Sequence, residues 1–260
     1  MLFIIVHDKI VNVKALVGSS VRDALPDEFP FIAAIVNDIP NFEYDKDLIC
    51  TGVLANRQSV ITTAHCLEQD FEYNIKLIIG SNDLLSLSQY HIAFWLSYNQ
   101  WAQYSRIHVT FSTNDICVLR LTSHVHRTIQ PAVIAYETYN QFNGQNIVLA
   151  GWGQINNTTF PRILQTSPAT VLSNENCLAR VNQLVSGQFI VDGNIFCSAG
   201  NPFTYVMLGD NGGPVVYRNR VIGINMGTCP HYENHQLHAN KVNIHINLYV
   251  YQHFLRIALQ

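Results

Sequence analysis

Short runs of β-branched and aromatic residues recur along the chain, and turn residues close each run. Apolar runs of about 4 to 8 residues with such boundaries are typical of strands, whereas helices need longer periodic segments. The sequence shows no βαβ rhythm, internal repeat or low-complexity tract. We predict strands over Phe31–Val36, Ser59–Thr63, Asn74–Ile79, Ile116–Leu121, Gln145–Ala150 and Val215–Asn225.

The C-terminal segment has a different periodicity. At a spacing of about 3.6 residues, one face collects the apolar residues Leu248, Tyr251, Phe254, Leu255 and Ala258. Asn247 precedes them and is a suitable helix cap. We therefore predict a helix over Asn247–Ala258, and no other helix, in an otherwise all-β chain.

Composition excludes several classes of protein. The 260 residues are 48% hydrophobic and 13% charged, with a net charge of −3. This apolar content excludes disorder and can fill one large core or two small ones. The small net charge gives no electrostatic basis for binding nucleic acid. No apolar run reaches the length of about 18 residues that a membrane-spanning helix requires.

The start of the chain is a weak secretion signal. Met1–Val6 is apolar, but His7, Asp8 and Lys9 follow directly. A secretory signal needs an apolar region of about 7 to 15 residues, so this segment is at best a truncated one.

Three segments carry candidate chemistry. His65 follows a β-branched run and is itself followed by Cys66. Asp115 lies at the start of an apolar strand. A buried carboxylate there needs a partner. The third segment, 208–214, is a glycine-rich turn whose backbone amides can converge on an anion. Taken singly, each has an ordinary interpretation: a structural histidine, a paired carboxylate and a simple turn.

In this order, and with several further motifs, the sequence resembles the trypsin/chymotrypsin family of serine peptidases. The segment 16–19 looks like the family's mature N-terminus, 29–30 like its first strand entry, and 151–153 like the strand that opens its second barrel. The resemblance implies two six-stranded antiparallel β-barrels with a C-terminal α-helix. It also implies a leader or propeptide remnant over 1–15 and a peptidase domain over 16–260, with the barrel boundary near 125–145.

The resemblance also implies a set of site residues. His65 and Asp115 take the catalytic positions, Gly209 and Asn211 those of the oxyanion hole, and Leu16 and Asp210 those of the activation pair. The specificity pocket is implied to contain Tyr205, Asn225, Met226, Gly227 and Leu237. Disulfides are implied for Cys50 with Cys66 and for Cys177 with Cys197. Met207 replaces the cysteine that would pair with Cys229, which leaves Cys229 and Cys117 as thiols.

Asn211 occupies the position of the family's nucleophilic serine. A carboxamide nitrogen shares its lone pair with the carbonyl and is no practical nucleophile. Tyr205 and Leu237 would obstruct the pocket, the Met207 position lacks its cysteine, and Ala15 rather than Arg or Lys precedes Leu16. These departures favour a homologue without peptidase activity, a binding or regulatory protein like the inactive homologues of arthropods. The alternative is a serine endopeptidase with residual activity or a misread nucleophile codon.

Other features have simpler interpretations. His231, His235 and His238 match a family surface loop, so we expect no metal, and no cofactor is implied. Trp95 and Trp101 fit core and loop anchoring better than an exposed recognition patch. The disulfides and two overlapping glycosylation sequons, at Asn156 and Asn157, predict a secreted glycoprotein. We expect a monomer whose partner is a protein, substrate or peptidase inhibitor.

Overall fold

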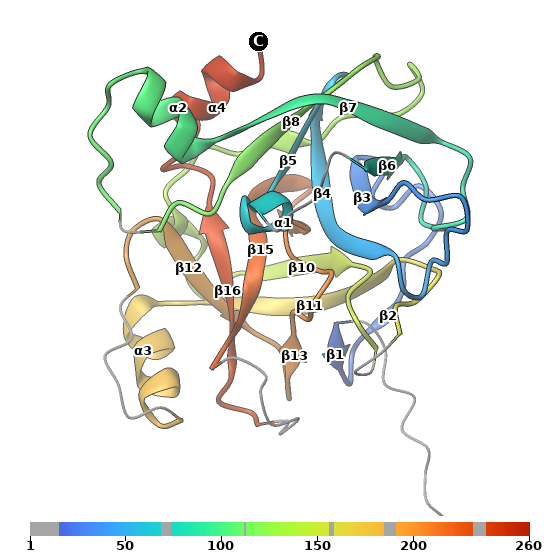
Figure 1. The fold of residues 1–260 in the computed structure, drawn as a ribbon. Coiled ribbons are helices and arrows are strands. Elements are labelled where there is room, and N and C mark those ends of the chain that lie inside the picture. Colours follow the sequence, from blue (N-terminus) through green and yellow to red (C-terminus); the bar gives the residue numbers. More distant parts are fainter. Residues whose placement is uncertain (1–15, 69–73, 112, 156–158, 185–190, 231–237) are drawn as a thin grey trace, which may run out of the picture.

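Two closed six-stranded antiparallel barrels contain most of the strands in the computed structural model (Figure 1). The structure describes residues 16–68, 74–111, 113–155, 159–184, 191–230 and 238–260. The first barrel has the order β3-β4-β5-β8-β7-β6. Its strands are β3 (Ile32–Asn37), β4 (Leu48–Asn56), β5 (Ser59–Thr62), β6 (Ile75–Ile79), β7 (Gln89–Ser97) and β8 (Cys117–Leu121).

The second barrel has the order β10-β14-β15-β16-β12-β11, and pairing of β10 with β11 closes it. Its strands are β10 (Asn146–Gly151), β11 (Gln165–Leu172), β12 (Ile195–Ala199), β14 (Pro214–Tyr217), β15 (Arg220–Cys229) and β16 (Val242–Asn247). Short strands flank it: β1 (Val17–Gly18) on β13 (Thr204–Tyr205), β2 (Arg22–Asp23) on β11, and β9 (Val133–Ile134) on β15. The predicted fold class is confirmed.

The predicted run Val215–Asn225 is in fact a hairpin of β14 and β15. Arg218 and Asn219 form its turn with φ of 46° and 61°, and Tyr217 pairs with Arg220 across it. Two consecutive residues with positive φ match the twist of a two-residue hairpin, and Asn tolerates this conformation well. The polar residues Arg218, Asn219 and Arg220 mark this turn in the sequence, so the prediction of one strand was wrong.

The helix predictions need two corrections. The C-terminal helix α4 (Gln252–Ala258) begins five residues later than predicted, because Asn247 is still paired in β16 opposite Gly223. The chain also has α1 (His65–Glu68), α2 (Tyr98–Tyr104), α3 (Asn174–Asn182) and the 3₁₀ turn η1 (Tyr139–Phe142). Ser97 and Gln100 form a reciprocal capping box at the start of α2, a local signal for a helix start.

Aromatic packing joins α2 to α4, which lie together in Figure 1. Trp101 is 6% exposed and contacts the rings of His253 and Phe254. Tyr98 contacts Tyr251 edge to face. The half-buried Trp95 packs against the first-barrel core. Both tryptophans therefore anchor the fold, as expected.

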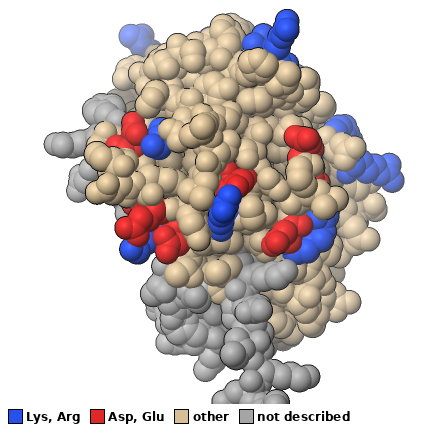
Figure 2. Space-filling model, turned by 90° about the vertical axis from the view of Figure 1, so that its right-hand side faces the viewer, with Lys and Arg blue, Asp and Glu red and all other residues tan. Residues whose placement is uncertain are grey.

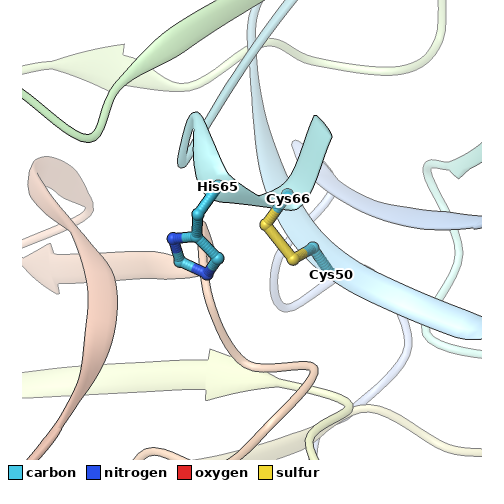
Figure 3. A group of neighbouring side chains, drawn as sticks. All are labelled: Cys50, His65 and Cys66. Atoms are coloured by element: carbon cyan, nitrogen blue, oxygen red, sulfur yellow. A yellow bond between two sulfur atoms is a disulfide. The ribbon is translucent and has the colours of Figure 1, made fainter. Parts of the chain in front are cut away.

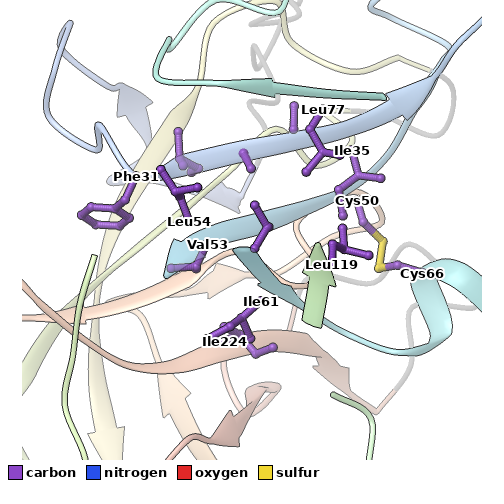
Figure 4. Packing of buried hydrophobic residues seen from close by; sticks show 14 of the residues in the cluster. Phe31, Ile35, Cys50, Val53, Leu54, Ile61, Cys66, Leu77, Leu119 and Ile224 are labelled. Atoms are coloured by element: carbon purple, nitrogen blue, oxygen red, sulfur yellow. A yellow bond between two sulfur atoms is a disulfide. The ribbon is translucent and has the colours of Figure 1, made fainter. Parts of the chain in front are cut away.

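One large core spans both barrels. Figure 4 shows Ile61 of β5 beside Ile224 of β15, and both side chains are fully buried. Burying such a side chain stabilises the fold by about 1.5 to 3 kcal/mol. Because the core includes residues of both barrels, it fixes the position of one barrel against the other.

The surface carries interspersed charges. On the face in Figure 2, acidic and basic side chains lie next to one another, without a large patch of one sign. Arg162 pairs with Asp83, and Arg22 with Glu28. Within the described ranges, no helix is long and apolar enough to cross a membrane.

Candidate active site

The imidazole of His65 is positioned by Asp115. His65 begins α1 directly after β5, and Asp115 lies just before β8, the strand that pairs with β5. The Asp115 carboxylate accepts a hydrogen bond from the His65 backbone at 2.9 Å and contacts Nδ1 at 2.7 Å. Because a carboxylate can only accept, Nδ1 carries the proton, and when the ring is neutral Nε2 is the acceptor.

Asn211 of the second barrel faces that acceptor. Its Nδ2 lies 3.0 Å from Nε2 of His65, which is 146 positions away in the sequence. The carboxamide therefore takes the place next to His65 where a base could activate a nucleophile. The structure brings together three residues that the sequence predicted for one site: His65, Asp115 and Asn211.

The turn that carries Asn211 has nearly all of its backbone groups paired. Asp210 donates its amide to Met207 and Gly212 donates its amide to Asn225. The carbonyl oxygens of residues 208–211 each accept a hydrogen bond as well. Within the described residues, the amides of Gly209 and Asn211 alone in residues 209–213 have no acceptor. Unpaired amides of this kind suit an anionic oxygen.

Asp210 is fully buried beside Leu16. Its carboxylate accepts hydrogen bonds from the backbone of Gly153 at 2.7 Å, of Met207 at 2.9 Å, and of Leu16. Burial raises the pKa of Asp210 from 3.8 to about 7, because these neutral amides only partly replace water. Ala15 precedes Leu16 in the sequence, so Leu16 offers an amide and not an ammonium group.

Tyr205, which the resemblance assigns to the specificity pocket, lies on β13. Its side chain is fully buried, and its hydroxyl donates to the His238 carbonyl at 2.5 Å and accepts from the His238 amide at 3.0 Å. Phe203 stacks on the ring. The tyrosine thus ties β13 to the segment that leads into β16.

Three of the other predicted pocket residues lie on β15. Asn225 is buried, whereas Met226 and Gly227 are partly exposed at a bulge in the pairing with β16. The side-chain carboxamide of Asn225 has no hydrogen-bond partner among the described residues. Leu237 lies outside the described residues, as do His231, His235 and the sequon residues Asn156 and Asn157.

Both implied disulfides form. Cys50 is bonded to Cys66, next to His65 (Figure 3), and Cys177 is bonded to Cys197. Cys117 and Cys229 lie outside these two bonds. Cys50, His65 and Cys66 also form a cluster of possible metal ligands. The disulfide consumes both thiolates, so this cluster offers a metal only the imidazole.

The second barrel also encloses a neutral histidine. His245 is fully buried, with Nε2 at 2.7 Å from the Ser198 hydroxyl. Burial lowers the pKa of His245 to about 3. No sequence motif marks this residue.

The sequence analysis did not predict that Thr51 supports the turn that carries Asn211. It is fully buried in β4, and its hydroxyl donates a hydrogen bond to the Gly209 carbonyl across the interface between the barrels. A single threonine in a strand has no local signature, because its contact with Gly209 spans 158 positions.

Comparison with known proteins agrees with this fold. The family model described as Trypsin matches residues 20–254. The chain is 29% identical over 222 residues to a fibrinolytic enzyme, isozyme C, of Lumbricus rubellus, covering 80% of this chain and 88% of that protein. It is 27% identical over 229 residues to achelase-1 of Lonomia achelous, covering 80% and 93%.

A solved structure shares the architecture. Neuropsin, a serine protease expressed in mouse brain, superposes with a TM-score of 0.72 at 20% identity, covering 92% of this chain and 99% of that one. This likeness shows the fold. Since the family model covers most of the chain, the protein belongs to the trypsin family of serine proteases.

Proposed function

We propose that the chain is a secreted serine-protease homologue that binds a protein partner through its cleft and does not hydrolyse peptide bonds. The observation that carries this proposal is the Asn211 carboxamide, 3.0 Å from His65 Nε2. The histidine has a base's position and the carboxylate orients it, but the adjacent group has no nucleophilic lone pair. An acyl-enzyme cannot form on Asn211.

The magnitude of this loss is large. In another serine peptidase, removal of the nucleophile lowers turnover by about 10⁶, and the residual rate comes from the oxyanion hole and binding. Asn211 is such a removal, while Gly209 retains an unpaired amide. We therefore expect a cleft that binds without catalysis.

Two further features support the proposal. Tyr205 is fully buried and its hydroxyl is bonded to the His238 backbone, so we expect no room for a substrate side chain in the implied pocket. Asp210 is paired with an amide of Leu16 instead of the ammonium that cleavage would create. A filled pocket removes substrate positioning, which can supply about 7 to 11 kcal/mol of a reaction barrier.

The class of partner and the compartment belong to the same proposal. Proteins of the family bind protein substrates and inhibitors, and a closed pocket leaves the surface around the cleft for such contacts. The two disulfides favour an oxidising, extracellular compartment, where Asn156 or Asn157 would carry a glycan. The proposed organisation is a leader or propeptide over 1–15, one peptidase-type domain over 16–260 and a barrel boundary near 125–145.

Activity measurements test the proposal. The full chain, secreted with its disulfides, is incubated with a fluorophosphonate probe for active-site serines and with a mixed peptide library. Neither labelling nor cleavage is expected. The matched control is His65→Ala, because cleavage that persists in that variant comes from a contaminant. Cleavage by the parent chain that His65→Ala abolishes would instead establish a residual endopeptidase.

A further inference from the structure

The turn at Gly209 is held from the first barrel by one threonine. Thr51 Oγ1 donates to the Gly209 carbonyl at 2.8 Å, and the Thr51 amide donates to the Asn211 carbonyl at 2.9 Å. Thr51 itself is held, because its own carbonyl accepts from the Thr62 hydroxyl at 2.8 Å. Thr51 and Thr62 are both fully buried, so water cannot replace these bonds.

The Thr51 bonds hold the peptide groups that follow Gly209 and Asn211, and two further backbone bonds hold the peptide groups that precede these two residues. In a trans peptide the C=O and N–H groups point in opposite directions. The Leu208 carbonyl accepts from Gln154 and the Asp210 carbonyl accepts from Gly213. The amides in the same two peptide groups, those of Gly209 and Asn211, therefore point away from these partners and stay unpaired.

Close packing leaves the turn little freedom beside Thr51. Gly212 has φ of +79°, and a Cβ atom there would lie 2.1 Å from the Thr62 hydroxyl and 2.2 Å from the Thr51 carbonyl. Only glycine fits so close to the two threonines. The contact between the barrels therefore determines the backbone path through residues 209–212.

We infer that the Thr51 hydroxyl is a positioning group that keeps the amides of Gly209 and Asn211 available to an anionic oxygen in the uncleaved chain. The reason is the cost of losing the bond. Without the hydroxyl, the buried Gly209 carbonyl would have no hydrogen-bond donor. This penalty favours rotation of the Gly209–Asp210 peptide group. The Gly209 amide belongs to the preceding peptide group, which Gln154 holds, so this rotation would act on it through the changed backbone path at Gly209.

This inference rests on the proposed function for the cleft as a binding site, but it does not require that the protein be inactive. It assigns to Thr51 the task of holding the turn while Leu16 remains part of a continuous chain. The site takes a single carboxylate or similar oxygen anion. Because Tyr205 fills the pocket, the most suitable probe has a carboxylate and no side chain.

The test is a titration of the full, ¹⁵N-labelled chain with N-acetylglycine, followed through the amide resonances of Gly209 and Asn211. Both resonances should shift and saturate, and chloride at equal ionic strength should not reproduce the shift. Thr51→Val should weaken binding about 3- to 10-fold, the effect of one hydrogen bond. Thr51→Ser keeps the hydroxyl and should bind as the parent does.

A matched control separates positioning from general stability. Thr166 is also buried and donates its hydroxyl to a backbone carbonyl, that of Leu149, at 2.9 Å, yet it makes no bond with the turn in the described structure. Thr166→Val should destabilise the chain without changing the affinity for N-acetylglycine. If Thr51→Val does not fold, Thr51→Ala serves in its place.

The outcomes are distinguishable. Parent-like binding by Thr51→Val, or an equal loss in Thr166→Val, would overturn the positioning role of Thr51. Absence of any shift in the parent chain would overturn the anion site. Peptide cleavage by the parent chain would contradict the proposed inactivity and leave the role of Thr51 standing.

Discussion

The buried carboxyl group of Asp210 predicts an unusual dependence of stability on pH. In the uncleaved chain burial raises the pKa of Asp210 from 3.8 to about 7. Below about pH 3.8 the group is protonated in both the folded and the unfolded state. As the pH rises, the unfolded chain releases this proton first. The stability that the protonated carboxyl group contributes therefore decreases until the pH has passed the folded-state pKa.

The magnitude follows from the pKa. Each pKa unit is worth about 1.4 kcal/mol, so Asp210 lowers the free energy of unfolding by about 4 kcal/mol at about pH 7.5 relative to pH 4. Asp210→Asn removes this term. The free energy of unfolding of Asp210→Asn minus that of the parent should therefore rise by about 4 kcal/mol between these two pH values.

The assay is urea unfolding at the two pH values, monitored by tryptophan fluorescence with the disulfides intact. The difference between variant and parent is the observable, because His245 acts in the opposite direction over the same range. Asp83→Asn is the control: Arg162 lowers the pKa of Asp83, so its contribution to stability is lost below these pH values and its difference should stay nearly constant between them. A difference for Asp210→Asn that stays constant between the two pH values would refute the reasoning.

Cleavage directly before Leu16 extends the test. An engineered site there would give Leu16 an ammonium group beside the Asp210 carboxylate. An adjacent positive charge favours the ionised carboxyl and lowers its pKa. The cut chain should lose the pH dependence, and Asp210→Asn should then destabilise it at neutral pH. Unchanged behaviour after cleavage would show that the new N-terminus does not reach Asp210.

Four further predictions follow from other residues. Asn211→Ser, even when cut before Leu16, should stay below about 1 s⁻¹ on mixed peptides, the low end of ordinary turnover, because Tyr205 remains; faster turnover would show that Asn211 alone inactivates the site. Tyr205→Ala should lower the free energy of unfolding by about 3 to 5 kcal/mol and Tyr205→Phe by about 1 to 3, measured in urea; equal losses would contradict a filled pocket. His245→Gln should reduce acid destabilisation by about 3 kcal/mol at pH 4, because burial lowers the pKa of His245 to about 3 and the unfolded chain binds the proton first; parent-like acid sensitivity would refute this. Alkylation in denaturant without reduction should label Cys117 and Cys229 alone, and a peptide linking them would contradict the assigned pairing.

Local patterns determined the class of the fold. The strand predictions rest on runs of neighbouring β-branched and aromatic residues. The observed ends lie within one residue of the predicted ends for β3, β5, β6, β8 and β10. The start of α4 was misjudged because the apolar spacing of the helix extends back to Leu248, a buried turn residue directly after β16. Periodicity cannot separate a buried strand from a buried helix over so short a run.

The sequence also supplied the chemistry of the candidate site, because the residue types of His65, Asp115 and Asn211 decide what each group can do. Only the tertiary structure decided how the site is held. Thr51 and Gly209 are 158 positions apart and meet where the two barrels pack, and the raised pKa of Asp210 comes from burial that no neighbouring residue encodes. The physical reason is that residue type determines bonding capacity, whereas solvent exclusion and long-range partners arise only when the two barrels pack together.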